Sequence, residues 1–238
     1  MSLCLLVTTF NRSPQLHRSL ERLCELTIPD EVLVIDDGGS DGCDNTCNQF
    51  TDRLPIRYIY NHRPQIETCC QARNVGLKNT DCDLIMTSEP ECYFVSDVVA
   101  QMLAVREQHP TLVCIAGKVH HNDMEPERIT LGWSATYTAL WGRREDMLAI
   151  GGWDEGFPGV WGFDDIDMLT RMRIYGCNQI IDNDIEILHQ FHTNTGHSLG
   201  AANGLVENDV YFQSKGLDHN SDNLVANVGR EWGVVRSR

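Results

Sequence analysis

Short apolar runs alternate with amphipathic stretches along the first half of the chain. The run LCLLVTT at 3–9 has the length and β-rich composition of a buried strand. The segment SPQLHRSLERLCEL that follows places Leu16, Leu20 and Leu23 on one helical face, with a serine placed to cap it and a proline at its first position. A second apolar run, EVLVIDD at 31–37, completes a β-α-β unit, which predicts parallel strands and a right-handed crossover.

The same alternation continues beyond this unit. IRYIY and CDLIMTS have the character of strands, and TCCQARNVGLKN between them has the character of a helix. The helix SDVVAQMLAVREQH and the strand TLVCIAG follow, and later helices are expected at 166–176 and 203–216. No Pro/Ser-rich linker divides the chain. The pattern therefore predicts a single α/β domain with a mostly parallel, Rossmann-like central sheet flanked by helices.

Polar segments follow three of the predicted strands. TTFNR comes after the first strand, DDGGSDG after the second and SEPE after the fourth. Ligands of open α/β sheets bind outside the carboxyl ends of the strands. We therefore expect these three segments to converge on one crevice.

Charge and composition exclude several classes of protein. The 238-residue chain carries a formal net charge of −15 and no basic patch, which disfavours nucleic acid as a partner. No apolar stretch has the length of a membrane span or the flanks of a signal peptide, so we expect a cytoplasmic protein. The 10 cysteines lack the usual zinc spacing, and we expect free thiols.

The aspartates of VIDDGGSDG allow two interpretations. Asp36 and Asp37 can accept hydrogen bonds from the glycine-rich turn that follows them, or one of them can bind the amide edge of a nucleobase. The segment lacks the G-x-G-x-x-G fingerprint, and no lysine follows its glycines. Both an NAD enzyme and a P-loop kinase are therefore disfavoured.

The segment SEPE places two carboxylates on either side of a rigid residue. Glu89 and Glu91 can belong to an exposed turn with solvated acids. Alternatively, carboxylates two residues apart can both reach one hard cation, Mn²⁺ or Mg²⁺, which in turn holds a diphosphate. No basic residue lies nearby in the sequence, which favours a cation.

The segment GVWGFDDIDM begins a predicted helix with three aspartates. Asp164 can cap the helix, and Asp167 can pair with Arg171 four residues later. Three carboxylates exceed what capping requires, so one of them is a candidate general base that deprotonates a hydroxyl. Trp153 and Trp161 nearby can offer flat apolar faces to sugar rings, or belong to the core.

Three histidines lie close together in EILHQFHTNTGH. His189 closes an apolar, strand-like run and is a candidate third metal ligand, with His192 and His197 following it. The alternative is a structural role for each of the three.

Together these motifs resemble the GT-A fold glycosyltransferases of family 2, with a second half similar to the C-terminal domain of the β-1,4-galactosyltransferases. LLVTTFNR, VLVIDDGGSDG and ARNVGL match the nucleotide-binding half in order and spacing, and GGWDEGFPGVWGFDDIDMLTRMRIYG matches the acceptor segment. The resemblance covers roughly residues 3–200. It implies one GT-A domain with a nucleotide-sugar half at 1–118, an acceptor and catalytic half at 119–200, and a C-terminal helix and tail at 201–238.

The resemblance also implies roles for individual residues on the donor side. Asp36 or Asp37 would bind uracil, and Glu89 would lie near the donor sugar. The remaining residues of the predicted nucleotide-sugar site are Thr8, Phe10 and Arg12 in the pocket, with Arg73 and Asn74 beside the nucleoside and diphosphate.

On the acceptor side, the resemblance makes Asp165 the catalytic base and assigns acceptor binding to Trp161, Gly162 and Asp164. The D-x-D metal motif of the family is replaced by Glu89, Pro90 and Glu91. An E-x-E pair keeps both carboxylates, so the predicted metal ligands are Glu91, Glu89 and His189. We expect Glu91 to contact the metal directly.

The sequence therefore predicts a metal-dependent, inverting glycosyltransferase of the hexosyltransferase type. It would move a hexose or N-acetylhexosamine from a UDP-sugar to a hydroxyl of a saccharide, protein or other acceptor. The alternatives are a catalytically inactive sugar-nucleotide or glycan-binding protein of the same fold, a retaining transferase, and a nucleotidyltransferase.

Overall fold

The structure of the chain is a computed structural model. The structure describes residues 1–63, 68–109, 112–121, 128–131, 139–192, 201–218 and 222–237. Side chains are described throughout these ranges except at 112–118, 121, 128–131, 201–203 and 222.

Parallel strands form the first half of the central sheet. The β-α-β unit predicted at the N-terminus is present as β1 (Leu3–Thr9), α1 (Ser13–Leu23) and β2 (Glu31–Asp36). β1 pairs with β2 on one side and with β4 (Leu84–Ser88) on the other, and β2 pairs with β3 (Ile56–Tyr60), all in parallel. The carboxyl ends of these strands therefore lie at one edge of the sheet.

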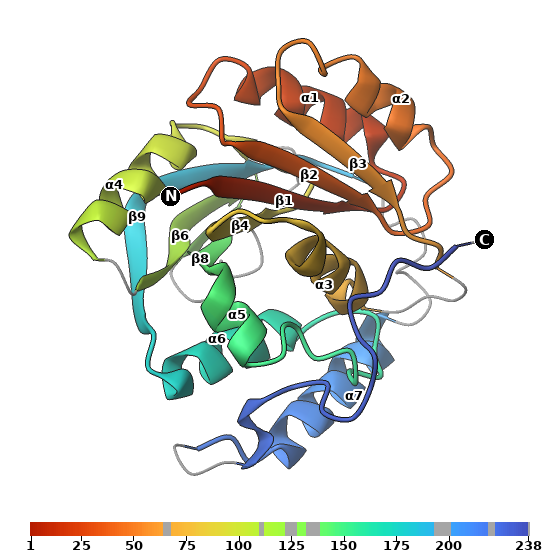
Figure 1. The fold of residues 1–238 in the computed structure, drawn as a ribbon, viewed down its shortest axis with the longest axis vertical. Helices are drawn as coiled ribbons and strands as arrows, with labels where there is room; N and C mark the ends of the chain where they lie inside the picture. The colour runs from red at the N-terminus through yellow and green to blue at the C-terminus, as the bar shows by residue number, and fades with distance from the viewer. Residues whose placement is uncertain are drawn as a thin grey trace.

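Both faces of this half of the sheet are covered. Figure 1 shows α1 and α2 (Cys43–Asn48) over one face and α3 (Cys70–Asn79) over the other. Every residue of β1 is buried, and alternate residues belong to two separate apolar clusters. This explains the continuous apolar run in the sequence, because a strand covered on both faces has no polar side.

Two details locate the helices. A Cβ added at Gly76 of α3 would lie 2.1 Å from Leu6 Cδ1, so α3 packs closely on β1. At the start of α1, Arg12 is the N-cap residue, and the prediction that Ser13 caps this helix is wrong. Asp41 from the loop after β2 performs this task instead, with Oδ2 accepting a bond of 2.7 Å from the Ser13 amide.

The second half of the sheet adds antiparallel pairs. β8 (Leu140–Arg143) pairs antiparallel with β4, and β6 (Leu112–His121) pairs antiparallel with β8 and with β7 (Arg128–Leu131). β9 (Asn178–His189) runs parallel to β6 and pairs antiparallel with β5 (Cys92–Phe94). The strand order is β3-β2-β1-β4-β8-β6-β9-β5, with β7 beside β6. The predicted α/β domain with a central sheet and flanking helices is confirmed. The sheet is mixed rather than mostly parallel, because four of the eight described strand pairings are antiparallel.

The remaining helices are α4 (Val98–Gln108), α5 (Arg144–Ala149), α6 (Asp164–Tyr175) and α7 (Ala201–Ser214), followed by a short 3₁₀ helix, η2 (Asp222–Leu224). α6 begins two residues before the predicted start and ends before Gly176, whose φ of +107° suits the left-handed C-cap. α7 lies outside α5 and α6, away from the sheet (Figure 1), and the chain then returns to the carboxyl ends of β1 to β3.

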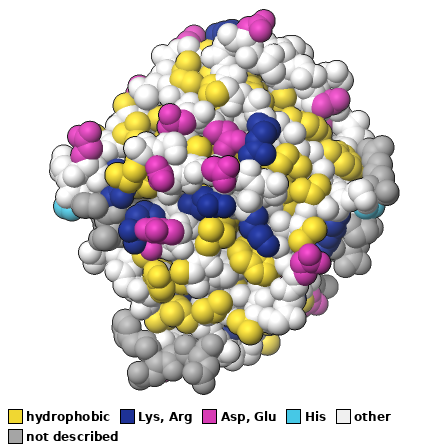
Figure 2. Space-filling view, viewed as in Figure 1, with side chains coloured by type: hydrophobic (Ala, Val, Ile, Leu, Met, Phe, Trp, Pro, Cys, Tyr) yellow, Lys and Arg dark blue, Asp and Glu magenta, His cyan; other side chains and the backbone are white. Residues whose placement is uncertain are grey.

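One face of the molecule is mixed in charge. On the face drawn in Figure 2, acidic and basic side chains are interspersed and apolar side chains reach the surface in several places. No helix among the described residues has the length and apolar character needed to cross a bilayer. The cysteines whose side chains are described are free thiols, as expected.

Candidate active site

The three polar segments predicted to converge do meet at the carboxyl edge of the sheet. The side chain of Asn11 accepts a bond of 2.8 Å from the Ser40 amide, and the Asp37 amide donates to the Thr9 carbonyl at 2.8 Å. These bonds join the loops after β1 and β2. Arg12 Nη2 lies 3.0 Å from His192 Nδ1, which brings the first loop to the segment after β9.

A carboxylate and two imidazoles gather beside this junction. The candidate ligand atoms of Glu91, His189 and His192 all lie within 4.8 Å of one another. Glu91 Oε1 is 3.2 Å from His192 Nε2 and 3.9 Å from His189 Nε2. Pairing of β5 with β9 sets this arrangement. Cys92, the residue after Glu91, lies opposite His189 in the sheet, so Glu91 is brought close to that histidine.

The environment of Glu91 suits a bound cation. Its Oε2 atom is buried and has no hydrogen-bond partner among the described residues. Burial opposes ionisation, but the hydrogen bond from His192 and the charges of both histidines lower the pKa of Glu91 below its usual range. A carboxylate with two imidazoles can hold a divalent ion that accepts both oxygen and nitrogen ligands. Mn²⁺ fits this donor set better than Mg²⁺, which prefers oxygen.

Arg73 of α3 lies at the centre of a second cluster. Its Nη1 atom is 2.6 Å from Asp164 Oδ2 and 2.8 Å from Asp165 Oδ1, and its Nη2 atom is 3.4 Å from Glu89 Oε1. The start of α6 supplies the two aspartates. One guanidinium therefore faces three carboxyl groups, more than its single charge can balance if all three are ionised.

Two of these carboxyl groups have perturbed proton affinities. Burial raises the pKa of Asp165 to about 7, with Arg73 opposing the shift and Asp164 adding to it. Burial and the charge of Glu91 raise the pKa of Glu89 well above its usual range. A carboxylate with a pKa near neutrality is suited to accepting a proton from a hydroxyl group during a reaction.

Glu89 and Glu91 therefore occupy different surroundings. Glu91 contacts the two histidines, whereas Glu89 points toward Arg73 and the aspartates of α6. His189 and His192 therefore both belong to the candidate metal site around Glu91. His197 lies outside the described residues.

The two aspartates after β2 also differ. Asp36 is buried and uses both oxygens within the fold, since Oδ1 accepts from the Gly39 amide at 2.7 Å and Oδ2 accepts from the Tyr58 hydroxyl at 2.7 Å. Burial raises its pKa. This is the turn-stabilising role that the sequence offered as one interpretation.

Asp37 lies among polar groups at the end of β3. Its Oδ1 atom accepts from Asn61 Nδ2 at 3.2 Å, and its Oδ2 atom lies 3.1 Å from Arg63 Nη1. The Arg63 guanidinium lies 5.6 Å from the centre of the Phe10 ring. Thr8 is largely buried in β1. Arg63 thus connects the ring of Phe10 with the carboxylate of Asp37.

Asn74 is placed behind the site rather than on its surface. Its fully buried side chain donates to the Trp153 carbonyl at 2.8 Å and to Glu155 Oε1 at 2.9 Å, and accepts from the Trp153 amide at 2.8 Å. Trp153 is itself fully buried, so it belongs to the core rather than offering a face to a sugar ring. Asn74 therefore anchors the loop that leads to α6.

The segment before α6 contains the predicted acceptor residues. Trp161 is 47% exposed, and Gly162 has a φ of +92° that favours glycine. Asp164 and Asp165 follow at the first two positions of α6. Asp167 pairs with Arg171 Nε at 2.7 Å, and both are fully buried, so one of the three aspartates has the structural role considered for it.

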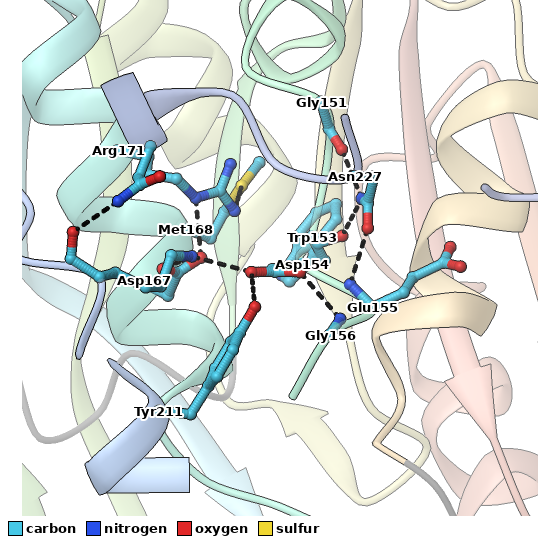
Figure 3. A network of polar contacts seen from close by, with 12 residues as sticks. Gly151, Trp153, Asp154, Glu155, Gly156, Asp167, Met168, Arg171, Tyr211 and Asn227 are labelled. Atoms are coloured by element: carbon cyan, nitrogen blue, oxygen red, sulfur yellow. Dashed lines mark hydrogen bonds and ion pairs between the residues drawn. The ribbon is translucent and has the colours of Figure 1, made fainter. Parts of the chain in front are cut away.

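Sequence reasoning missed several polar residues around this segment. Asp154 Oδ2 accepts from the Tyr211 hydroxyl and lies 3.0 Å from Lys215 Nζ, which also contacts Asp167. In Figure 3, Tyr211 points from α7 toward Asp154, and Asn227 lies between Gly151, Trp153 and Glu155. No local motif marks these contacts, because they join residues far apart in the chain.

Comparison with curated proteins finds relatives among glucosyltransferases. Validoxylamine A glucosyltransferase from Streptomyces hygroscopicus subsp. limoneus is 23% identical over 237 residues, covering 79% of this chain and 52% of that protein. The protein of the same name from S. hygroscopicus subsp. jinggangensis is also 23% identical, with 79% and 56% covered. The chain spans about half the length of these curated relatives.

Solved structures of similar fold include proteins from S. aureus and Pyrobaculum calidifontis. S. aureus TarS 1–349 matches with a TM-score of 0.67 and 14% identity, covering 80% of this chain and 60% of that chain. Mannosyltransferase PcManGT from Pyrobaculum calidifontis, in complex with GDP-Man and Mn²⁺, matches with a TM-score of 0.67 and 17% identity, covering 94% and 68%. TarS 1–349 has also been solved with UDP-GlcNAc. These likenesses establish the fold.

A sequence model described as "Glycosyl transferase family 2" matches residues 4–163. The match includes the loops after β1, β2 and β4 and ends one residue before Asp164. It covers well over half of the chain, and the chain belongs to glycosyl transferase family 2.

Proposed function

We propose that this protein is a metal-dependent, inverting glycosyltransferase that transfers a hexose or N-acetylhexosamine from a UDP-sugar to an acceptor hydroxyl. The observation that carries the proposal is the adjacency of two clusters at the carboxyl edge of the sheet. One is the candidate metal site of Glu91, His189 and His192, and the other is the Arg73 cluster with Asp164 and Asp165. Family membership supports the same reaction class.

In this proposal the donor binds over residues 1–118. Asp37 interacts with the uracil base because it belongs to the group that Arg63 and Phe10 form, whereas Asp36 is bonded to the Gly39 turn and to Tyr58. Thr8 lies beneath the proposed pocket. Arg12 lies next to the metal site, where its guanidinium can bind a diphosphate oxygen. A cation held by Glu91, His189 and His192 would offset the charge that develops on the departing nucleotide.

The acceptor side is supplied by residues 119–200, with a segment similar to that of the β-1,4-galactosyltransferases. Trp161 offers an exposed indole face to a sugar ring, and Gly162 and Asp164 line the same turn. Glu89 and Arg73 lie between this turn and the metal site, where they can orient the donor sugar. Asn74 contributes by holding the loop behind them.

Asp165 is the base in this mechanism. Its carboxylate accepts the proton of the acceptor hydroxyl while that oxygen forms a bond to the anomeric carbon. The bond from the anomeric carbon to the diphosphate oxygen breaks at the same time, and the departing UDP keeps the electron pair. A single displacement of this kind inverts the configuration at the anomeric carbon.

The test is a panel of nucleotide sugars incubated with Mn²⁺, with nucleotide release measured in the presence and absence of EDTA. GDP-mannose and UDP-GlcNAc are bound in solved structures of this fold, and UDP-glucose is included because the curated relatives are glucosyltransferases. We expect UDP release that stops with EDTA and returns with added Mn²⁺. Release from GDP-mannose alone would contradict the UDP assignment.

The same experiment separates the alternatives. Tight UDP binding without any release, for every donor and with several simple saccharides as acceptors, would identify a catalytically inactive binding protein. An NMR analysis of the anomeric configuration of the product distinguishes inversion from retention. Retention would overturn the single-displacement mechanism while leaving the donor assignment intact.

A further inference from the structure

A single buried asparagine of α7 holds the segment that contains Trp161. Asn208 is fully buried, and its Oδ1 atom accepts a bond of 2.6 Å from the Gly159 amide. Its Nδ2 atom donates to the Gly162 carbonyl at 2.9 Å and to the Trp161 carbonyl at 3.1 Å. The whole amide group is therefore used outside its own helix, and it fixes the backbone on both sides of Val160.

The backbones of α7 and of this segment are in direct contact. A Cβ added at Gly159 would lie 2.1 Å from the Gly204 carbonyl oxygen, and one added at Gly204 would lie 3.0 Å from the Val160 nitrogen. Gly204 and Asn208 are four residues apart, on the same face of the helix. The two glycines thus permit the close approach that allows Asn208 to reach the segment.

The held backbone has an unfavourable conformation. Gly162 has a φ of +92°, and Phe163, which is not a glycine, has a φ of +65°. A side-chain-bearing residue occupies this region only when its surroundings impose it. The Phe163 ring also packs 5.8 Å from the ring of Phe212 on α7, so α7 contacts the turn through both backbone and side chain.

The turn leads directly to the acidic residues of the site. Phe163 is the N-cap residue of α6, and Asp164 and Asp165 follow it. Both aspartates contact Arg73, at 2.6 Å and 2.8 Å. A change in the turn would therefore move both the exposed indole of Trp161 and the carboxylates that face Arg73.

We propose that Asn208 is a positioning residue for the acceptor side of the site. It holds residues 159–163 so that Trp161 faces the acceptor and α6 begins with its two aspartates against Arg73. This inference rests on the proposed function. α7 lies beyond residues 4–163, the part that matches the family model, so the positioning element belongs to the unmatched part of the chain.

Two variants and a control on the same helix test the proposal. Asn208→Ala removes every bond to the segment, whereas Asn208→Asp keeps an acceptor for the Gly159 amide and loses the donors to Trp161 and Gly162. Val210→Ala changes a side chain that is 65% exposed on the same helix and serves as the control. Thermal unfolding of each variant establishes that it is folded.

The first measurement is hydrogen exchange of peptides covering residues 156–163 and, for comparison, residues 84–94. We expect exchange at 156–163 to accelerate at least about tenfold in both Asn208 variants. Alanine loses every bond that closes the turn, and aspartate sets a buried carboxylate oxygen against the Trp161 and Gly162 carbonyls. Exchange at 84–94 should stay unchanged. Equal exchange at 156–163 in Asn208→Ala and Val210→Ala would overturn the proposal.

The second measurement compares two quantities. The affinity for UDP in the presence of Mn²⁺ reports on the donor side, and the rate at which water releases UDP from a UDP-sugar reports on the reaction. We expect the UDP affinity of both Asn208 variants to stay within about twofold of the wild type, while the release rate falls about tenfold or more. Parallel losses of affinity and rate would show a general structural role and would overturn the proposal. Absence of UDP release from the wild type would instead contradict the proposed function, while hydrogen exchange still decides whether Asn208 holds the turn.

Discussion

Asp165 Oδ1 lies 2.8 Å from Nη1 of Arg73, at the point where α6 meets α3. The same nitrogen contacts Asp164 at 2.6 Å. Because Asp165 is buried next to a second carboxylate, its pKa is raised to about 7 despite this ion pair. The proton affinity of Asp165 is therefore set by the balance between burial and a single guanidinium.

The first prediction concerns the pH dependence of the reaction. A base must be deprotonated to accept a proton, so the turnover rate should rise with pH around a midpoint of about 7 and fall about tenfold per pH unit well below it. Asp165→Asn should lower the rate by about 10²–10⁴-fold and leave UDP binding intact. Rate profiles between pH 5 and 9, combined with calorimetry of UDP binding, check both statements. Transfer that persists in Asp165→Asn would show that another group is the base.

Removal of Arg73 should affect both stability and titration. Arg73→Ala leaves three carboxylates without their common partner, and breaking a buried ion pair costs about 3–5 kcal/mol of unfolding free energy. Any remaining activity should show a midpoint above that of the wild type, because Arg73 opposes the rise in the Asp165 pKa. Urea unfolding and the pH–rate profile measure the two effects.

The matched control for Arg73 is Arg57→Ala. Arg57 pairs with Glu31 at 2.8 Å, but its side chain is 44% exposed, and exposed pairs contribute about 0–1 kcal/mol. A loss of stability in Arg57→Ala as large as that in Arg73→Ala would contradict the importance assigned to burial.

The two glutamates of SEPE should respond differently to the same substitution. Glu91→Gln removes the carboxylate from the group formed with His189 and His192. Loss of a residue that only supports a metal ligand lowers metal affinity by about 10–100-fold. Because Glu91 is itself the proposed ligand, we expect a larger loss of Mn²⁺ affinity. Glu89→Gln should leave Mn²⁺ affinity within a few fold, because Glu89 faces Arg73. Electron paramagnetic resonance of Mn²⁺ measures both. A larger loss in Glu89→Gln than in Glu91→Gln would reverse the assignment of the ligand.

Lys215 should connect α7 to the body of the fold through buried charge. It contacts Asp154 at 3.0 Å and also contacts Asp167, and all three side chains are largely buried. Lys215→Met should therefore cost about 3–5 kcal/mol at pH 7. Burial opposes ionisation of Asp154, but the charge of Lys215 holds its pKa below the usual range.

A depressed carboxyl pKa adds stability above the pKa of the unfolded chain, and this contribution disappears as pH falls through the lower pKa of the folded state. The stability difference between wild type and Lys215→Met should consequently be largest near neutral pH and shrink at pH 3 and below. Urea unfolding at pH 7 and pH 3 provides the comparison. A difference that stays constant with pH would exclude a charge-based role for Lys215.

The predictable part of the fold is the part with local signals. β1, β2 and β4 are covered on both faces, so each is a continuous apolar run, and the polar loops at their ends had to share one edge of a parallel sheet. β8 is only four residues long and contains Gly142, so no alternation marks it as a strand. Its antiparallel pairing with β4 became visible only in the structure.

The site divides in the same way. The acidic segments and His189 could be found because their residue types and positions after strands are unusual for a core. The bonds of Asn208 and Lys215 could not be found, because they reach 46–61 residues along the chain. A lone Asn within a helix and a lone Lys just after it predict only solvent exposure. The aspartates of α6 illustrate both cases, since one motif contains residues facing Arg73 and one residue, Asp167, that serves the core.

The C-terminal tail should support the nucleotide pocket through Asn61. The Arg236 amide donates to Asn61 Oδ1 at 2.9 Å, and the Arg236 carbonyl accepts from the His62 amide at 2.8 Å. Asn61 is fully buried, and its Nδ2 atom donates to Asp37, the carboxylate that we propose to bind the uracil base. Loss of one hydrogen bond to a charged group corresponds to about 1.5–3 kcal/mol.

Deletion of residues 233–238 removes the Arg236 amide that donates to Asn61 and the Val234 carbonyl that accepts from Gln71, while leaving Asp37 in place. We expect UDP affinity to fall about tenfold, and Asn61→Ala should produce a loss of similar size. Asn48→Ala, at an exposed position of α2, is the control and should leave UDP affinity unchanged. If the deletion and Asn61→Ala are combined, the losses should not add, because both act on the same carboxylate. Additive losses would mean that the tail contacts the nucleotide independently of Asn61.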